Sequence, residues 1–328
     1  MKKIRWGIFG TGAIAHTFSD ALSKCENAEL CVISSRSEEK AKAFAEKYGF
    51  KKAYGSYELL AADPEVDIVY IATPMSSHYD DVMLCLRRGK NVLCEKSVTL
   101  NQWQLDDILT LAREKRLFFM EAMWLKCRPS YLKAKEWVQS GRIGKAKAVK
   151  ADFCNTVPVD MNSRLFRLDC GGGSLLDLAV YPLTLAADFL GNYPCEITSS
   201  AVMGDMGIDL TDLIHLTYAD GSHASVTASM QTASDNSASV IGTDGFILFD
   251  SGFVWSCGVT LYDKNGIELD RFEYQNDING YEYEIREAMR CLSEGLTESP
   301  LVKQCDTEAV MKIMDSCREQ WGFSYPEE

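Results

Sequence analysis

The sequence predicts an α/β protein of two domains, the first of which is a Rossmann-type, doubly wound parallel sheet. In the first third of the chain, short apolar strands alternate with amphipathic helices, an order typical of parallel sheets. Further along, turns of the Asp-Gly and Asn-Gly type join several strands, which predicts an α+β domain with a large, mostly antiparallel open sheet. The 328 residues suit two domains, and we place them at 1–121 and 122–328.

Local patterns justify each element of the first domain. The stretch 37–48 is amphipathic, begins at the capping residue Ser37 and is followed by Gly49, which often ends a helix. Apolar runs between polar or glycine-containing segments give the strands. The predicted strands are 6–9, 29–34, 52–54, 66–72, 91–94 and 117–120, and the predicted helices are 16–24, 37–48, 56–61, 77–88 and 101–115.

The second domain is read in the same way. Three glycines at 171–173 lead into a long apolar helix with Ser174 as its expected N-cap. We expect the domains to pack directly and to leave a ligand-binding cleft between them. The predicted strands are 146–153, 213–218, 224–230, 239–242, 246–249 and 260–262, and the predicted helices are 129–140, 174–190, 281–294 and 306–321.

Composition excludes several classes of protein. A formal net charge of −13 argues against nucleic acid or an anionic membrane as a general partner. No apolar run approaches the roughly 20 residues that span a bilayer. The 12 cysteines are dispersed without a Cys-x-x-Cys pair, and the four histidines lack metal-ligand spacing. We therefore expect no metal site, no disulfide framework and a reducing, cytoplasmic location.

A glycine turn between the first strand and the first helix predicts a dinucleotide site. Gly10 allows a tight turn, Gly12 lets the backbone approach a pyrophosphate, and the N–H groups at the helix start face the anion. An ordinary glycine-rich turn is the alternative, but the strand–turn–helix context favours the cofactor. The residues predicted to bind it here are Phe9, Gly10, Thr11, Gly12, Ala13 and Ile14.

The tip of the second strand predicts which dinucleotide binds. NAD-binding proteins usually carry a carboxylate there for the ribose hydroxyls, but this chain has Ser34, Ser35 and Arg36. Hydroxyls and a guanidinium suit a 2′-phosphate, so we predict NADP rather than NAD. The alternative is a solvated basic turn with Ser37 as the helix cap.

Two further groups of residues could carry chemistry. Glu95 and Lys96 follow an apolar strand, at the sheet edge where open α/β folds bind ligands. Asp177 and Tyr181 are four residues apart and share a helix face. The alternatives are a solvated Glu-Lys loop, an Asp that complements the helix dipole and a Tyr packed in the core.

Other side chains could line a substrate pocket. Arg164 and Arg167 precede the glycine triplet and could bind substrate oxygens or form ion pairs. Trp124, Phe153 and Phe166 could form an apolar wall, although aromatic residues are more often core.

The chain resembles the Gfo/Idh/MocA oxidoreductase family over essentially its whole length. Within this family it is most similar to the dimeric enzymes that dehydrogenate trans-dihydrodiols or D-xylose with NADP. Where the family has proline after the Glu-Lys pair, this chain has Ser97. The landmarks are Gly10-Thr11-Gly12, Ala72-Thr73-Pro74 with His78, Gly89-Lys90-Asn91-Val92, Glu95-Lys96, and Gly171-Gly172-Gly173 followed by Asp177.

The resemblance implies an NADP-dependent dehydrogenase of a sugar or cyclic diol that forms a homodimer or larger homo-oligomer. Two alternatives stay open, namely a dehydrogenase of another sugar or inositol and a dinucleotide-binding sensor without turnover. The implied catalytic residues are Lys96, Asp177 and Tyr181. The resemblance adds Thr73, Pro74, His78, Glu95 and Lys96 to the cofactor site, and the predicted substrate site comprises Lys96, Trp124, Phe153, Arg164, Asp177 and Tyr181.

Overall fold

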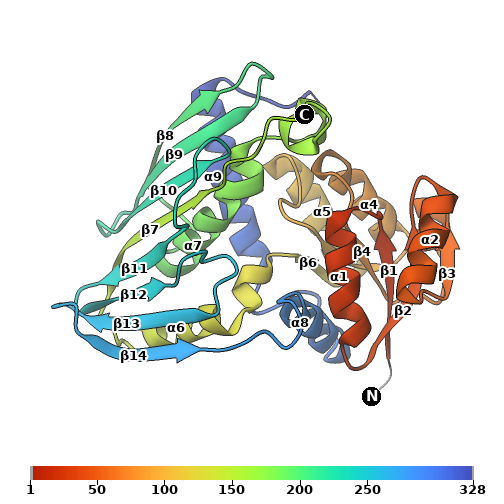
Figure 1. Cartoon of the computed structure of the whole chain (residues 1–328), viewed down its shortest axis with the longest axis horizontal. Coiled ribbons are helices and arrows are strands. Elements are labelled where there is room, and N and C mark those ends of the chain that lie inside the picture. Colours follow the sequence, from red (N-terminus) through yellow and green to blue (C-terminus); the bar gives the residue numbers. More distant parts are fainter. Residues whose placement is uncertain (1–2, 327–328) are drawn as a thin grey trace. The chain divides into compact units, whose positions relative to one another are not determined.

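The computed structural model describes residues 3–326 and divides into two compact units, each described by itself (Figure 1). The first unit comprises the chain up to Thr99 together with Trp103–Trp124 and Asn276–Gln304, and the second comprises the rest. The sequence placed Asn276–Gln304 in the second domain. This segment joins the first unit because Asn279 donates to the carbonyl of Thr17 at 3.0 Å, and the carbonyl of Thr297 accepts from the N–H of Phe119 at 3.1 Å.

The first unit contains a six-stranded parallel sheet in the order β3-β2-β1-β4-β5-β6. The order reverses direction between β1 and β4, as a doubly wound sheet requires, and this confirms the predicted fold class. The strands are β1 (Ile4–Phe9), β2 (Ala28–Ser34), β3 (Lys52–Tyr54), β4 (Ile68–Ile71), β5 (Asn91–Cys94) and β6 (Phe119–Glu121).

The helices of this unit begin and end where the sequence indicates. Ser37 caps α2 by accepting a hydrogen bond from the N–H of Lys40 at 3.3 Å. Gly49 ends the same helix in the left-handed conformation, at φ 82°. The helices are α1 (Ala13–Lys24), α2 (Glu38–Tyr48), α3 (Tyr57–Ala62), α4 (His78–Arg87), α5 (Gln102–Lys115) and α8 (Glu282–Ser293).

The second unit is built on an eight-stranded sheet in the order β14-β13-β12-β11-β7-β10-β9-β8. Neighbours are antiparallel except β7 and β10, which run parallel. The sequence missed β8 and β14, both of which lie at sheet edges. The strands are β7 (Ala146–Cys154), β8 (Glu196–Met203), β9 (Asp209–Thr217), β10 (His223–Ser229), β11 (Ala238–Gly242), β12 (Gly245–Phe249), β13 (Gly258–Asp263) and β14 (Glu268–Glu273).

One face of this sheet is covered by helices, among which α7 packs on β7 and β10, and α6 packs on β13 and β14. The predicted helix 174–190 is not uniform, because it begins as a π-helix at Leu175–Ala179 and continues as α7. The stretch Leu168–Leu190 is long and apolar enough to cross a membrane, but most of it is buried as a core helix. The α-helices are α6 (Pro129–Gln139), α7 (Val180–Leu190) and α9 (Gln304–Trp321).

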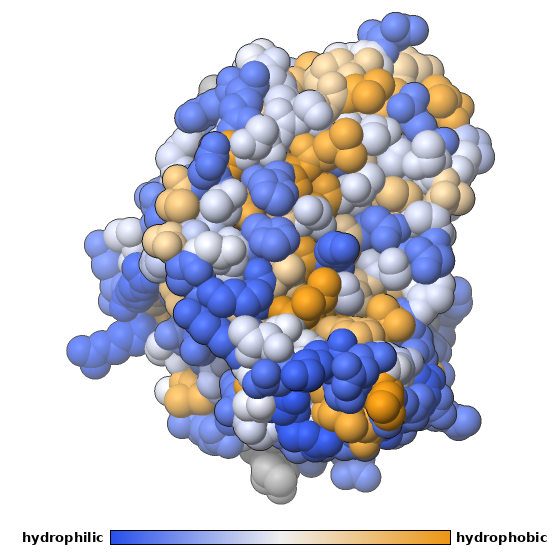
Figure 2. Space-filling model, turned by 90° about the vertical axis from the view of Figure 1, so that its left-hand side faces the viewer, coloured by the Kyte–Doolittle hydropathy of each residue, from blue (hydrophilic) through white to orange (hydrophobic). Residues whose placement is uncertain are grey.

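The other face of the large sheet carries a mixture of hydrophobic and hydrophilic residues (Figure 2). Leu213 and Leu248 are 53% and 38% exposed there. Phe246 of β12 and Tyr262 of β13 stack on each other with ring centroids 4.9 Å apart.

Candidate active site

The glycine turn between β1 and α1 has the geometry of a phosphate cradle. Gly10 has φ 96°, and a Cβ on it would lie 2.7 Å from the carbonyl oxygen of Ala72. A Cβ on Gly12 would meet no atom within 4 Å. The start of α1 carries no acidic side chain in its first turn and no side-chain cap. Its N–H groups are thus available to an anion, and these residues fit a dinucleotide.

The tip of β2 separates the three residues that the sequence grouped together. Ser34 is fully buried and donates to the carbonyl of Ile8 at 3.3 Å, so its hydroxyl serves the sheet. Ser35 accepts from the N–H of Ser37 and from the hydroxyl of Thr11, at 3.3 and 3.5 Å. Arg36 is exposed. Arg36 is therefore the residue of the three whose side chain is open to a ligand.

Thr73 and Pro74 lie after β4, at the same edge of the sheet. The Thr73 hydroxyl donates to Asp81 at 2.6 Å. Burial raises the pKa of Asp81 to about 6, while the Thr73 hydrogen bond acts in the opposite direction. Phe9 stacks on Tyr57, with ring centroids 4.5 Å apart.

His78 links the two loops that follow β4 and β5. Its Nδ1 lies 3.0 Å from the carbonyl oxygen of Ser97, and its Nε2 lies 3.0 Å from that of Thr73. The ring is 1% exposed. Because Ser97 follows Lys96 directly, His78 fixes the backbone next to the predicted catalytic lysine, whose own side chain is partly exposed. His78 thus supports the two loops.

Glu95, which the sequence placed in the cofactor site, is buried near a second acid, Glu284, that the sequence did not single out. Tyr70 donates to Glu95, and Glu284 of α8 is fully buried near Glu95 with no hydrogen bond to either of its oxygens. Burial and the charge of Glu95 hold the pKa of Glu284 well above its usual range. One signal could have found it, since Glu284 lies on the same helix face as Ile285 and Ala288, which are core residues.

Tyr181 and Asp177 occupy the start of the helix in the second unit. Asp177 lies in the π-helical turn and forms an ion pair with Arg164 at 3.1 Å. Tyr181 is 8% exposed, and its ring meets Phe153 edge to face at a centroid distance of 5.5 Å. The structure thus brings four predicted residues of this unit together.

The remaining aromatic and basic candidates divide between core and surface. Phe166 is 1% exposed and is a core residue. Trp124 belongs to the first unit, where it stacks on Tyr281 with ring centroids 4.8 Å apart. Arg167 pairs with Asp169 on the surface. Lys96 belongs to the first unit, and Asp177 and Tyr181 belong to the second.

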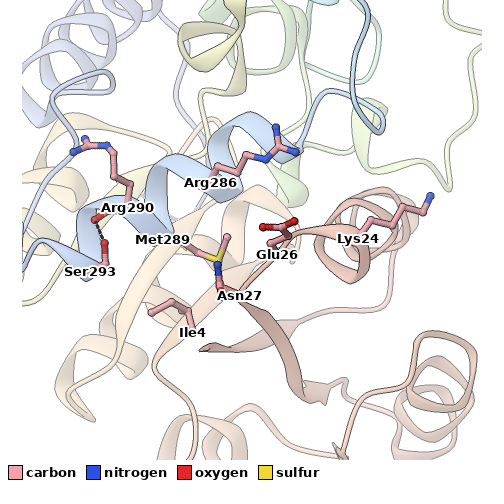
Figure 3. A pocket seen from close by; sticks show the side chains of 8 residues that line it. All are labelled: Ile4, Lys24, Glu26, Asn27, Arg286, Met289, Arg290 and Ser293. Carbon is pink, nitrogen blue, oxygen red and sulfur yellow. Dashed lines mark hydrogen bonds between the residues drawn. The ribbon is translucent and has the colours of Figure 1, made fainter. Parts of the chain in front are cut away.

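The first unit also has a cavity of about 590 Å³ at the opposite end of β1 from Gly10 (Figure 3). Ligands of open parallel sheets bind at the carboxyl ends of the strands, which excludes this cavity as the dinucleotide site. Its cations Lys24, Arg286 and Arg290 are each engaged in an ion pair. The lining residues are Ile4, Lys24, Glu26, Asn27, Arg286, Met289, Arg290 and Ser293.

Full-length relatives share the sequence of both halves of the chain. A trans-1,2-dihydrobenzene-1,2-diol dehydrogenase of Xenopus laevis is 34% identical over 330 residues, which are 98% of this chain and 99% of that protein. The Homo sapiens protein of the same name is 31% identical over 333 residues, which are 99% of each.

Solved structures show the same fold. KijD10, a 3-ketoreductase from Actinomadura kijaniata in complex with NADP and TDP-benzene, matches with a TM-score of 0.86 and 26% identity over 97% of this chain and 98% of its own. Aldose-aldose oxidoreductase from Caulobacter crescentus matches with a TM-score of 0.87 and 22% identity, over 97% of this chain and 98% of its own.

Two family models match this chain, one in each half. "Oxidoreductase family, NAD-binding Rossmann fold" matches residues 4–123, and "GFO/IDH/MocA C-terminal domain" matches residues 131–248. The glycine cradle lies in the first match, and the helix start with Asp177 and Tyr181 lies in the second. With relatives above 30% identity over nearly the whole length, this chain belongs to the Gfo/Idh/MocA family of oxidoreductases.

Proposed function

We propose that the protein is an NADP-dependent dehydrogenase that oxidises a hydroxyl-bearing carbon of a sugar or a cyclic diol, or reduces the corresponding carbonyl. One observation carries the proposal: Tyr181 is a largely buried phenol near the start of a helix. Asp177, four residues before it, forms an ion pair with Arg164. The relatives named dihydrodiol dehydrogenases support a diol as the substrate. The 3-ketoreductase whose structure contains NADP supports a nucleotide-dependent reaction at a carbonyl group.

The bound nicotinamide would supply the hydride acceptor or donor. Tyr181 takes the hydroxyl proton during oxidation and returns it during reduction. A tyrosine has an ordinary pKa of about 10, so it needs a nearby cation to act near neutrality. We assign that role to Lys96, which also donates a hydrogen bond to the substrate oxygen. Asp177 and Arg164, already paired, bind neighbouring hydroxyls of the substrate.

NADP is proposed over NAD because of the tip of β2. Arg36 is exposed there, and an arginine suits a 2′-phosphate through paired hydrogen bonds. Ser35 is the second candidate, since Ser34 is engaged inside the sheet.

A substrate panel tests both parts of the proposal. NADP reduction is followed by absorbance with pentoses, hexoses, inositols and cyclic trans-diols, and each active substrate is repeated with NAD. We expect turnover with at least one sugar or diol and a higher kcat/KM with NADP. Cofactor binding without turnover across the panel would support a sensor, and a higher kcat/KM with NAD would refute the assignment of Arg36.

We also propose that the protein forms a homodimer through the open face of the large sheet. This face carries apolar side chains toward both edges of the sheet, namely Leu213 of β9 on one side and Phe246, Leu248 and Tyr262 of β12 and β13 on the other. Figure 2 shows hydrophobic residues among hydrophilic ones there. Pairing two such faces about a twofold axis removes apolar surface from water. Light scattering at micromolar concentration should give twice the chain mass, and Leu213→Glu should shift the mass toward one chain. A wild-type mass of one chain would refute the dimer.

A reducing, cytoplasmic location is proposed from the cysteines. All 12 lie within the described residues, where none is in a disulfide, and eight of them are buried. Cysteines used as small apolar core residues suit a compartment that keeps thiols reduced.

A further inference from the structure

Two buried aspartates of the second unit lie against the helix start that carries Asp177 and Tyr181. Asp209 and Asp212 of β9 are both fully buried. They are three residues apart, which in a regular strand would turn their side chains to opposite faces. The ladder between β8 and β9 shifts between Val202 and Met203, where Leu210 is the extra residue of β9. This bulge reverses the alternation, so both carboxyls enter the core.

Asp209 performs the capping that the sequence assigned to Ser174. The Ser174 side chain makes no capping hydrogen bond. Instead, the N–H of Leu175 donates to the Asp209 carboxylate at 2.5 Å. A carboxylate at a helix start also complements the helix dipole. The helix that follows runs from Leu175 to Leu190, first as the π-helix and then as α7.

The glycine triplet makes this contact possible. Gly173 has φ 129°, and a Cβ on it would lie 2.3 Å from an oxygen of Asp209. A Cβ on Gly172 would lie 2.6 to 2.8 Å from three backbone carbonyls of the turn that contains Arg164. The helix start is therefore held between Asp209 on one side and the Arg164 turn on the other. Any displacement of it moves Asp177 and its ion pair with Arg164.

Asp212 is the second carboxyl group at this helix start. Its carboxyl is close enough to Asp209 and to Ser174 for both to act on its charge, but neither of its oxygens has a hydrogen-bond partner. Burial and the charge of Asp209 hold the pKa of Asp212 well above its usual range. The other titratable groups nearby are the thiols of Cys317 on α9 and Cys154 on β7. Within residues 3–326 no lysine, arginine or histidine forms a salt bridge with either aspartate.

We propose that Asp209 and Asp212 act as a carboxylate and a carboxylic acid that share one proton, and that this pair positions Asp177 and Tyr181 for the reaction. The proposal rests on the proposed function for the roles of Asp177 and Tyr181. Burial raises the pKa of Asp209 too, but the N–H of Leu175 stabilises its charged form. We therefore assign the charge to Asp209 and the proton to Asp212, because two buried charges side by side are unfavourable. Asp209 and Asp212 are positioning residues that do not touch the substrate.

A thermal experiment tests the shared proton without using activity. The folded pair holds a proton that the same groups release in the unfolded chain above about pH 4. Wild-type stability therefore falls as pH rises from 5 to 8. Asp212→Asn has no such proton, so its melting temperature relative to wild type should rise by several degrees over this range. A difference that is constant with pH would overturn the shared proton.

A kinetic and exchange experiment tests the positioning. Asp209→Asn should lower kcat at least about ten-fold while the KM for NADP stays within two-fold, and amide hydrogen exchange should speed up in the peptide covering residues 174–181. Ile214→Val, a buried change on the same strand, is the control for general destabilisation and should alter neither. Unchanged exchange in Asp209→Asn would overturn the proposal. Should wild type show no turnover, the proposed function fails while the exchange and melting data still decide this inference.

Discussion

In the first unit the proposed phosphate cradle consists of the main chain at Gly10 and Gly12, whereas in the second unit the proposed acid–base group and its neighbours are the side chains of Tyr181, Asp177 and Arg164. A site made of main-chain groups requires residues without side chains. A Cβ at such a position would occupy space that the ligand or a neighbouring carbonyl needs. A side-chain site depends on polar atoms that are present and on distant residues that fix the helix beneath them. The two units should therefore fail under opposite kinds of substitution.

The largest effect is expected from the loss of one oxygen in the second unit. Tyr181→Phe should lower kcat about 100-fold or more, because it removes the group that transfers the proton. The control is Tyr218→Phe, since the Tyr218 hydroxyl is buried without a hydrogen bond and its removal should leave kcat unchanged. Steady-state kinetics with the best substrate of the panel measures both. Near-normal turnover in Tyr181→Phe would remove the proton-transfer role from this residue.

Added carbon atoms in the first unit should come next. Gly12→Val should lower the affinity for NADPH by about ten-fold or more, because its side chain enters the space that a pyrophosphate would occupy. The free energy of unfolding should change by less than about 1 kcal/mol, since a Cβ there meets no protein atom. Fluorescence titration and urea unfolding measure the two quantities. Unchanged affinity would show that the cradle does not use the main chain of this turn.

Gly10→Ala tests the same turn through both NADPH affinity and stability. Its Cβ meets the carbonyl oxygen of Ala72 and its φ is positive, so both affinity and stability should fall, the latter by about 2 kcal/mol or more. Gly49→Ala is the matched control, because Gly49 also has a positive φ but no neighbouring atom within 4 Å. It should lose only about 1 kcal/mol and keep the affinity for NADPH. Equal losses in both variants would mean that strain alone explains the result.

The smallest effect on NADPH affinity is expected from a side chain in the first unit. Because burial raises the pKa of Asp81 to about 6, the folded state holds a proton that the unfolded chain lacks between about pH 4 and 6, and stability falls across this window as pH rises. Asp81→Asn should therefore gain about 2 kcal/mol relative to wild type by pH 7 and almost nothing at pH 4. The exposed Asp80→Asn serves as control. A large loss of NADPH affinity in Asp81→Asn would contradict a cradle made by backbone.

Local sequence was sufficient for the first unit because each of its elements has its own signals. Ser37 and Gly49 bound α2 as expected, and apolar runs gave every strand of the parallel sheet. In the second unit, the edge strands β8 and β14 were missed because their side chains are mostly polar or exposed. Strands of this kind are stabilised by pairing with a neighbour, which a single segment does not reveal.

The candidate site divides along the same line. The glycine turn, Arg36, Lys96, Asp177 and Tyr181 could be named from motifs and family resemblance. The buried acids could not, because Asp209 lies 34 residues beyond Leu175 and the packing of Glu284 against the first unit requires the chain to return there. Such contacts are set by tertiary structure, and the only local signal among these acids was the place of Glu284 on the apolar face of α8.

The return of α8 to the first unit has a consequence for how the protein folds during its synthesis. The strands and helices up to Trp124 leave the ribosome early, yet they lack the partner surface of Asn276–Gln304 until most of the chain has been synthesised. Phe18 and Tyr70, which stack on each other, lie beside Tyr281 and Glu284 of that late segment. Domains usually fold as units during synthesis. Here, the apolar surface that the late segment covers stays exposed on the nascent nucleotide-binding half. We therefore expect a fragment that ends at residue 121 to aggregate.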